Sequence, residues 1–155
     1  MRAQKKKRPR GVVDTSVLVA GIAGFRTRGR QRENASAALI REWIERDTFV
    51  WLLTDEILQE YKSVLGRLGV RRPLIGKVIN LLREEAEAVF TPRSANISPD
   101  PGDDPFCACA EQGHADFIVT LNQGDFPQRL LSAHVISPEE EIPTTGRRKK
   151  PQRAR

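Results

Sequence analysis

Cysteines, long apolar runs and internal repeats are scarce or missing in this chain. Its 155 residues include only two cysteines, Cys107 and Cys109, and one pair cannot brace a small secreted fold. No apolar run reaches the roughly 18 residues that span a bilayer, and no repeat indicates a solenoid. We therefore expect a single cytoplasmic domain with no membrane span and a pair of core thiols.

Acidic residues are absent from both ends of the chain. Residues 1–10 carry six basic side chains and residues 146–155 carry six more, whereas residues 11–145 carry 14 basic and 20 acidic ones. This distribution predicts a basic N-terminal tail at 1–10 and a folded domain at 11–138. A C-terminal tail, first acidic and then basic, is expected at 139–155. Such tails either keep a protein in solution or contact polyanions without regard to sequence.

Short apolar runs alternate with amphipathic segments along the predicted domain. Strands are expected at 11–14, 49–53, 88–90, 115–120 and 133–136. Helices are expected from 17, where a hydroxyl of Thr15 or Ser16 can cap the first turn, after Asn34, and at 54–68, 73–82, 104–113 and 126–131. Strands that alternate with helices favour a mainly parallel sheet covered on both faces, which is an α/β class of fold.

Several acidic and polar residues are expected at the carboxyl end of this sheet, where α/β proteins bind their ligands. Asp14 ends the first strand, and Glu60 lies at the edge of the apolar stripe of the 54–68 helix. Asp104 begins a helix that leads into the 115–120 strand. The further candidates for this acidic pocket are Asp103, Asp116 and Asp125, with Thr120 and Asn122 at the strand end.

Carboxylates that share a dry pocket need a counter-charge, because like charges raise each other's pKa. Neither Asp14 nor Asp104 has a Lys or Arg within three residues. Oxygen ligands without His or Cys at ligand spacing favour Mg²⁺ or Mn²⁺ over Zn²⁺. Such a metal can activate water for attack on a phosphodiester. Arg26, Arg28, Arg30 and Arg32 lie in a predicted loop at 25–32 and can hold a phosphate backbone near this site.

Each candidate also has a purely structural interpretation. Asp104 can be only a helix cap, and Glu60 a solvated residue on a helix surface. Thr15, Ser16 and Thr120 can simply satisfy backbone groups. Asp116 can lie before the core of its strand, at the end far from the pocket. Asp14 is the hardest to explain in this way, because a buried strand end seldom carries a carboxylate without a partner.

Four motifs in order resemble the PIN-domain family, and in particular the toxin ribonucleases of toxin–antitoxin pairs. They are Val12-Val13-Asp14-Thr15-Ser16, the 54–65 segment with Glu60, Asp103-Asp104-Pro105, and Ala115-Asp116-Phe117-Ile118-Val119-Thr120 followed by Asn122 and Asp125. The resemblance covers roughly residues 11 to 138.

This resemblance implies a three-layer α/β/α sandwich and Mg²⁺-dependent cleavage of RNA. It also implies a cognate antitoxin protein and a possible homodimer. Asp14 and Asp104 would hold the metal together with Glu60, and Thr15, Ser16 and Thr120 would orient ligands or water. The fourth acidic position of the family is Asn122 in this sequence, and Asp116, or else Asp125, would compensate as a catalytic acid.

Two other functions are compatible with the sequence. The first is an RNA-binding PIN module with little or no catalysis, which the neutral Asn122 and the basic tails suggest. The second is a phosphatase or receiver-like domain with Asp14 as the nucleophile or phosphate acceptor. A phosphatase of that kind needs a second Asp two residues later, where this chain has Ser16.

Overall fold

The fold is seen in a computed structural model that describes residues 7–26, 33–91 and 104–144, apart from the side chains of Arg26 and Asp104. Within these residues, one five-stranded sheet has the order β3-β2-β1-β4-β5, and every pair of neighbours is parallel. The strands are β1 (Arg10–Val13), β2 (Val50–Leu53), β3 (Glu87–Ala88), β4 (Phe117–Val119) and β5 (His134–Ile136).

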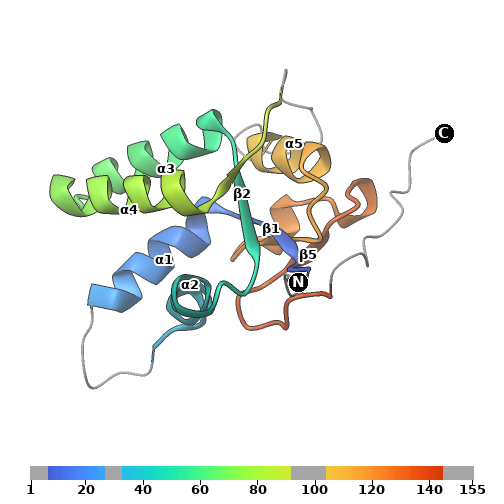
Figure 1. The fold of residues 1–155 in the computed structure, drawn as a ribbon, viewed down its shortest axis with the longest axis horizontal. Coiled ribbons are helices and arrows are strands. Elements are labelled where there is room, and N and C mark those ends of the chain that lie inside the picture. Colours follow the sequence, from blue (N-terminus) through green and yellow to red (C-terminus); the bar gives the residue numbers. More distant parts are fainter. Residues whose placement is uncertain (1–6, 27–32, 92–103, 145–155) are drawn as a thin grey trace, which may run out of the picture.

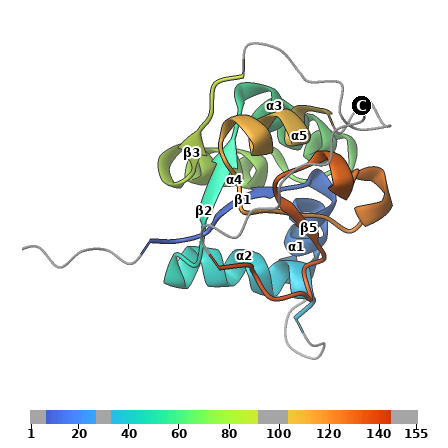
Figure 2. The same cartoon turned by 90° about the vertical axis from the view of Figure 1, so that its right-hand side faces the viewer.

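Helices connect these strands and form the outer layers. They are α1 (Thr15–Arg26), α2 (Ala35–Arg46), α3 (Asp55–Arg67), α4 (Arg72–Glu85) and α5 (Asp104–Gln112), with two short 3-10 turns at Gln123–Asp125 and Gln128–Leu130. Helices α1 and α2 cover one face of the sheet, whereas α3 and α5 cover the other, with α4 beside α3 (Figures 1 and 2). The predicted three-layer sandwich with a parallel sheet is confirmed.

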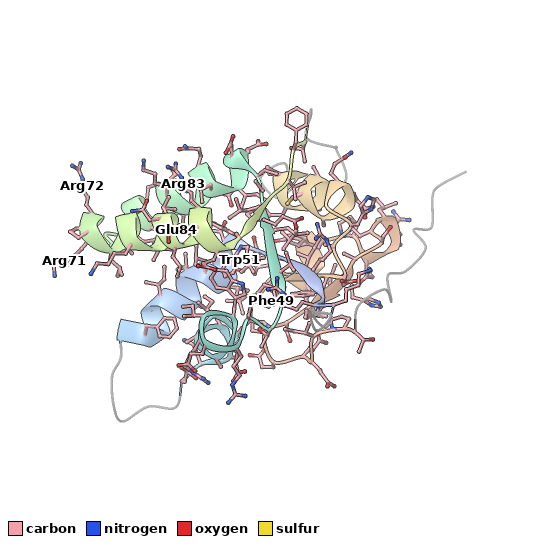
Figure 3. The ribbon with its side chains drawn as sticks, viewed as in Figure 1. Phe49, Trp51, Arg71, Arg72, Arg83 and Glu84 are labelled. Carbon is pink, nitrogen blue, oxygen red and sulfur yellow. The ribbon has the colours of Figure 1, made fainter. Side chains whose placement is uncertain are left out.

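Apolar side chains of the short strands form the centre of the core. Phe49 and Trp51 lie where the β2 strand crosses the molecule (Figure 3), and both are 1% exposed or less. The Phe49 ring meets Phe117 edge-on with centroids 5.3 Å apart. Gly11 pairs with Phe117 in the sheet, and a Cβ at Gly11 would lie 2.1 Å from the Phe117 ring. The close packing of these two strands therefore requires glycine at position 11.

Side-chain caps begin two of the helices as the sequence predicts. The Asn34 side chain accepts a hydrogen bond from the Ala37 N–H at 2.7 Å, and the Thr54 hydroxyl accepts one from Ile57 at 3.1 Å. Both cysteines are buried as core thiols. These local signals depend on neighbouring residues alone, which is why the sequence contains them.

The structure departs from the sequence-based expectation at four places. In place of the helix expected at 126–131, a 3-10 turn covers only Gln128–Leu130. Strand β1 begins at Arg10, and the Pro9 carbonyl accepts a hydrogen bond from Val50, so the end of the predicted 1–10 tail joins the sheet. Helix α1 begins at Thr15 directly after β1, without a hydroxyl cap. It also continues through Arg26, into the segment expected to be a loop.

The length and hydropathy of the described helices bear on whether this part of the chain crosses a membrane. None of the helices in residues 7–26, 33–91 and 104–144 is both long enough and apolar enough to cross a membrane.

Candidate active site

The strand order reverses at β1, since the chain first moves outward through β2 and β3 and then returns to place β4 on the other side of β1. Helices that leave neighbouring strands in opposite directions open a crevice beyond the carboxyl ends of those strands. Asp14 directly follows β1 and Thr120 directly follows β4. Both side chains therefore lie at the point where an α/β sheet binds its ligands.

Hydroxyl groups surround the Asp14 carboxylate. Asp14 is 5% exposed, and its Oδ2 accepts hydrogen bonds from Thr120 Oγ1 at 2.8 Å and from Ser16 Oγ at 2.6 Å. The Leu121 N–H donates to Ser16 Oγ, and the Asn122 N–H donates to Thr120 Oγ1. The carboxylate is thus held in one orientation by side chains that are themselves held by the backbone.

Glu60 joins Asp14 in this crevice from helix α3. The Thr15 hydroxyl donates a hydrogen bond to the Glu60 carboxylate. Burial raises the pKa of the half-buried Glu60, the Thr15 hydrogen bond lowers it, and the negative charge of Asp14 raises it; the net direction is upward. The site therefore brings together two carboxylates, and the protein environment disfavours the charge on the second.

Tyr61 and helix α5 fix the geometry around this pair. The buried Tyr61 hydroxyl donates a hydrogen bond to the Val13 carbonyl, one residue before Asp14. The Tyr61 ring centroid lies 6.3 Å from that of Phe106, in the first turn of α5. Helix α5, which begins at Asp104, therefore starts at the same end of the sheet as Asp14, although the Asp104 side chain is outside the described residues.

Asp116 occupies the opposite end of the sheet, which corrects its prediction as a compensating acid beside Asn122. It precedes β4, is 3% exposed, and its Oδ2 accepts a hydrogen bond from the Arg10 N–H at 2.8 Å. Arg10 begins β1, whereas Asp14 follows its last residue. The side chain cannot face both ends of one parallel strand pair, so Asp116 does not join Asp14 and Glu60.

The remaining predicted site residues divide into two groups. Asn122 and Asp125 are exposed beside Thr120, where Asn122 precedes the 123–125 turn and Asp125 ends it. The others lie outside the described residues: Asp103, Arg28, Arg30 and Arg32 entirely, and Arg26 and Asp104 in their side chains. The prediction that Thr15 or Ser16 caps the helix is wrong, because α1 already begins at Thr15; both hydroxyls donate to carboxylates of the site.

The donor set suits a hard divalent cation. Asp14 and Glu60 offer carboxylate oxygens, and neither forms an ion pair with a described Lys or Arg. Among the side chains that the structure describes, no three His, Cys, Asp or Glu residues form a metal-binding group. The described part of the site therefore contributes two carboxylates, and Mg²⁺ in proteins is commonly held by one or two.

Sequence reasoning missed two features near this site. Tyr61 has no predicted role in the site, yet its hydroxyl ties α3 to the end of β1. The basic residues between positions 62 and 83 were also not singled out. An acid-free stretch with six Lys or Arg residues was the available signal for them.

The parallel sheet, its switch point and the paired carboxylates define an α/β protein with an acidic ligand-binding crevice. Comparison with protein families agrees with this class: residues 10–124 match the sequence profile of the PIN domain, and the chain belongs to the PIN-domain family. PIN domains are generally nucleases. The comparison with curated proteins finds no match.

Proposed function

We propose that this protein is a Mg²⁺- or Mn²⁺-dependent endoribonuclease, and that it is the toxin of a toxin–antitoxin pair. The observation that carries the proposal is the pair of carboxylates, Asp14 and Glu60, held together at the switch point of the sheet by Thr15, Ser16 and Thr120. A buried carboxylate beside a half-buried one, with no ion-pair partner among the described residues, costs free energy unless a ligand compensates the charge.

Each residue of the cluster has a separate task in this proposal. Asp14 and Glu60 hold the cation together with Asp104, the residue at which α5 begins. Ser16 and Thr120 occupy one oxygen of Asp14, so the carboxylate has a fixed orientation toward its ligand. When bound, the cation supplies a coordinated water for in-line attack on the phosphodiester and stabilises the developing charge.

The direct test uses the full chain, purified free of partners, with a pool of structured and single-stranded RNAs. Cleavage is compared in Mg²⁺ or Mn²⁺ and in EDTA. We expect metal-dependent cleavage that is lost in Asp14→Asn and in Asp104→Asn. Asp55→Asn is the matched control, because Asp55 is an exposed acid in the first turn of α3 and contacts no member of the cluster. Undiminished cleavage by both site variants would contradict the proposal.

The alternative function, an RNA-binding PIN module without catalysis, is favoured by one observation. The family's fourth acidic position is the neutral Asn122, which is exposed at the mouth of the crevice. Binding to RNA with a steep salt dependence, without cleavage in either metal, would establish this alternative. In that case Asp14→Asn would leave RNA binding unchanged or strengthen it, because a negative charge is removed.

A protein partner is supported by an apolar groove between α1, α2 and α4. The groove has a volume of about 370 Å³, and Phe25 and Ile44 on its rim are 40% and 52% exposed. Exposed apolar surface of this kind is typical of interaction sites, which fits an antitoxin or a second copy of the chain. The toxin assignment predicts that expression of the wild type arrests bacterial growth, whereas Asp14→Asn does not. Normal growth with an active nuclease would contradict the toxin assignment alone.

A further inference from the structure

The segment 62–83, which spans the second half of α3 and most of α4, has an unusual charge for this domain. It contains six basic residues and no Asp or Glu: Lys62, Arg67, Arg71, Arg72, Lys77 and Arg83. Without these six, the 14 basic residues of 11–145 fall to eight, against 20 acidic ones. Six of the 14 basic residues of 11–145 therefore lie in one stretch of 22 residues that has no acid.

These cations are available to a ligand. All six are exposed, and within the described residues none forms an ion pair with a carboxylate. Arg41 of helix α2 differs from these six residues, because it forms ion pairs with Glu33 and Glu45. The acids of these helices, Asp55, Glu56, Glu60, Glu84 and Glu85, lie at or toward the other ends of α3 and α4 and do not line the groove described next, which is lined by cations alone among charged residues.

A groove runs between the two helices at this surface. It has a volume of about 760 Å³ and includes Gly66 of α3, Gly69 of the connecting turn and Gly76 of α4. A Cβ at any of these three glycines would meet no described neighbour within 4 Å. The glycines therefore leave the bottom of the groove open, and Lys62, Arg72 and Arg83 also line it.

The spacing of the cations matches an extended ligand. Arg72 and Arg83 are eleven residues apart in α4, which places them within about 20° of the same helix face and roughly 16 Å apart along the axis. Figure 3 shows both on the side of α4 toward α3, whereas Arg71 points to the opposite side. A single small anion cannot bridge that span, but a polyanion with regularly spaced charges can.

From this geometry we propose that the groove between α3 and α4 binds the sugar–phosphate backbone of the RNA strand outside the cleaved nucleotides. The lining residues described are charged, small or aliphatic, and none is aromatic. Base stacking, the usual second component of single-strand binding, is therefore missing from the groove. The groove contacts phosphates and carries no sequence preference.

Helix α3 connects the groove to the crevice that holds Asp14, so the inference rests on the proposed ribonuclease function. Lys62 and Gly66 lie about 200° and 240° around α3 from Glu60, on the far edge of the helix. Arg67 lies about two turns from Glu60 on nearly the same face, and its charge lowers the pKa of Glu60. A strand that leaves the crevice would cross one helix width, roughly 10 Å, past Arg67 before it enters the groove.

The test compares two pairs of substitutions that remove the same charge from the same helix. Arg72→Gln with Arg83→Gln neutralises the groove, whereas Arg71→Gln with Lys77→Gln neutralises exposed cations outside it. Both pairs are placed in the full chain with Asp14→Asn, so that RNA is bound and not cleaved. The probe is a labelled polyuridylate long enough to span crevice and groove, and its Kd is measured over a series of KCl concentrations.

We expect the groove pair to weaken binding by about tenfold, and to lower the slope of log affinity against log salt by roughly 1.4, as for two lost phosphate contacts. The control pair should change the affinity by less than about twofold. A second variant tests shape without charge: Gly66→Gln with Gly76→Gln fills the floor and improves helix propensity. It should weaken RNA binding while it raises Tm.

Equal losses from the groove and control pairs, or an unchanged Kd for the glycine variant, would overturn the inference. Tighter binding of a polyglutamate peptide than of RNA with equal charge would also overturn it, in favour of an acidic protein ligand. In the cleaving protein the groove pair should raise KM for long RNA and leave cleavage of an oligonucleotide confined to the crevice unchanged. If the wild type cleaves no RNA, the proposed function fails. The binding measurement still tests whether RNA binds in the groove between α3 and α4.

Discussion

Two buried aspartates stand at opposite ends of the same pair of parallel strands, and their surroundings differ. Asp116, at the amino end, is 3% exposed, and Asp14, at the carboxyl end, is 5% exposed. Asp116 accepts the Arg10 N–H, and the Arg10 guanidinium beside it pairs with Glu87 and donates to the Gly113 carbonyl. Asp14 has hydroxyl groups as partners and shares its surroundings with the carboxylate of Glu60.

This contrast separates a structural carboxylate from a functional one. At the amino end, the Arg10 N–H satisfies the Asp116 carboxylate and the Arg10 guanidinium pairs with Glu87, so the arrangement is complete without a ligand. At the carboxyl end, neither of the two acids forms an ion pair with a described Lys or Arg, and burial together with the charge of Asp14 raises the pKa of Glu60. Burial alone does not identify a site; the charge balance around the buried group does.

The largest expected effect is the difference in RNA cleavage between variants of Asp14 and variants of Asp116. Asp14→Asn should lower metal-dependent RNA cleavage by at least about a hundredfold, because a ligand charge is lost while the amide oxygen still accepts from Thr120. Asp116→Asn should leave cleavage within about twofold, measured as initial rates in Mg²⁺. Asp116→Ala should lower the free energy of unfolding by about 1–3 kcal/mol in urea, because the Arg10 N–H loses its partner. Loss of cleavage in Asp116→Asn would remove the distinction between the two ends.

The next effect concerns the hydroxyl that orients Asp14. Thr120 is fully buried, and Thr120→Val keeps its shape while it removes the hydrogen bond to Asp14. We expect a loss of about 10–100-fold in metal affinity or cleavage, with recovery in Thr120→Ser. Thr48→Val is the matched control, since the buried Thr48 hydroxyl has no hydrogen-bond partner among the described atoms. The measurement is a Mg²⁺ titration of cleavage, and equal losses in Thr120→Val and Thr48→Val would contradict an orienting role.

The pH dependence of the site sharpens the comparison further. Glu60 must be deprotonated to hold a cation, and its raised pKa moves the loss of metal binding on acidification to a higher pH than for an ordinary glutamate. Thr15→Val removes the hydrogen bond that lowers this pKa, so the acid limb of the pH–rate profile should shift to still higher pH. An acid limb that stays in place would show that the limb belongs to another group.

In the metal-free protein, the raised pKa of Glu60 means that its charged form destabilises the fold. A carboxyl whose pKa is higher in the folded than in the unfolded state stabilises the fold at low pH, and that contribution is lost as pH rises through the folded pKa. Glu60→Gln should therefore raise Tm at neutral pH in EDTA, although it removes a metal ligand. A lower Tm for this variant would indicate that Glu60 stabilises the metal-free fold.

The smallest effect concerns Tyr61, which joins the site to the core. Tyr61→Phe removes one buried hydrogen bond to the Val13 carbonyl and leaves the ring contacts in place. It should lower the free energy of unfolding by about 1–2 kcal/mol in urea. Cleavage should fall only a few-fold, because Asp14 and Glu60 keep their hydroxyl partners. A loss as large as that of Asp14→Asn would place Tyr61 among the residues that contact the substrate.

Much of the fold could be predicted because its signals are local. The apolar runs at 49–53 and 115–120 contain β2 and β4, and the caps at Asn34 and Thr54 hold as expected. The positions of Asp14 and Thr120 at strand ends follow from the same pattern, so the parallel sheet predicts that they meet. The start of α1 was not predictable in this way, because the hydroxyls of Thr15 and Ser16 suit a cap as well as a carboxylate.

The sequence by itself determined the alternation of strands and helices, the family motifs and the acids available at the carboxyl end of the sheet, since each depends on residues close together in the chain. Only the tertiary structure decided that Asp116 belongs to the other end and that Lys62, Arg72 and Arg83 line a glycine-floored groove. The physical reason is distance along the chain: Arg10 and Asp116, whose hydrogen bond fixes the place of Asp116, are 106 residues apart. Strand register and helix packing alone bring such residues together, and they do not depend on any short stretch of sequence.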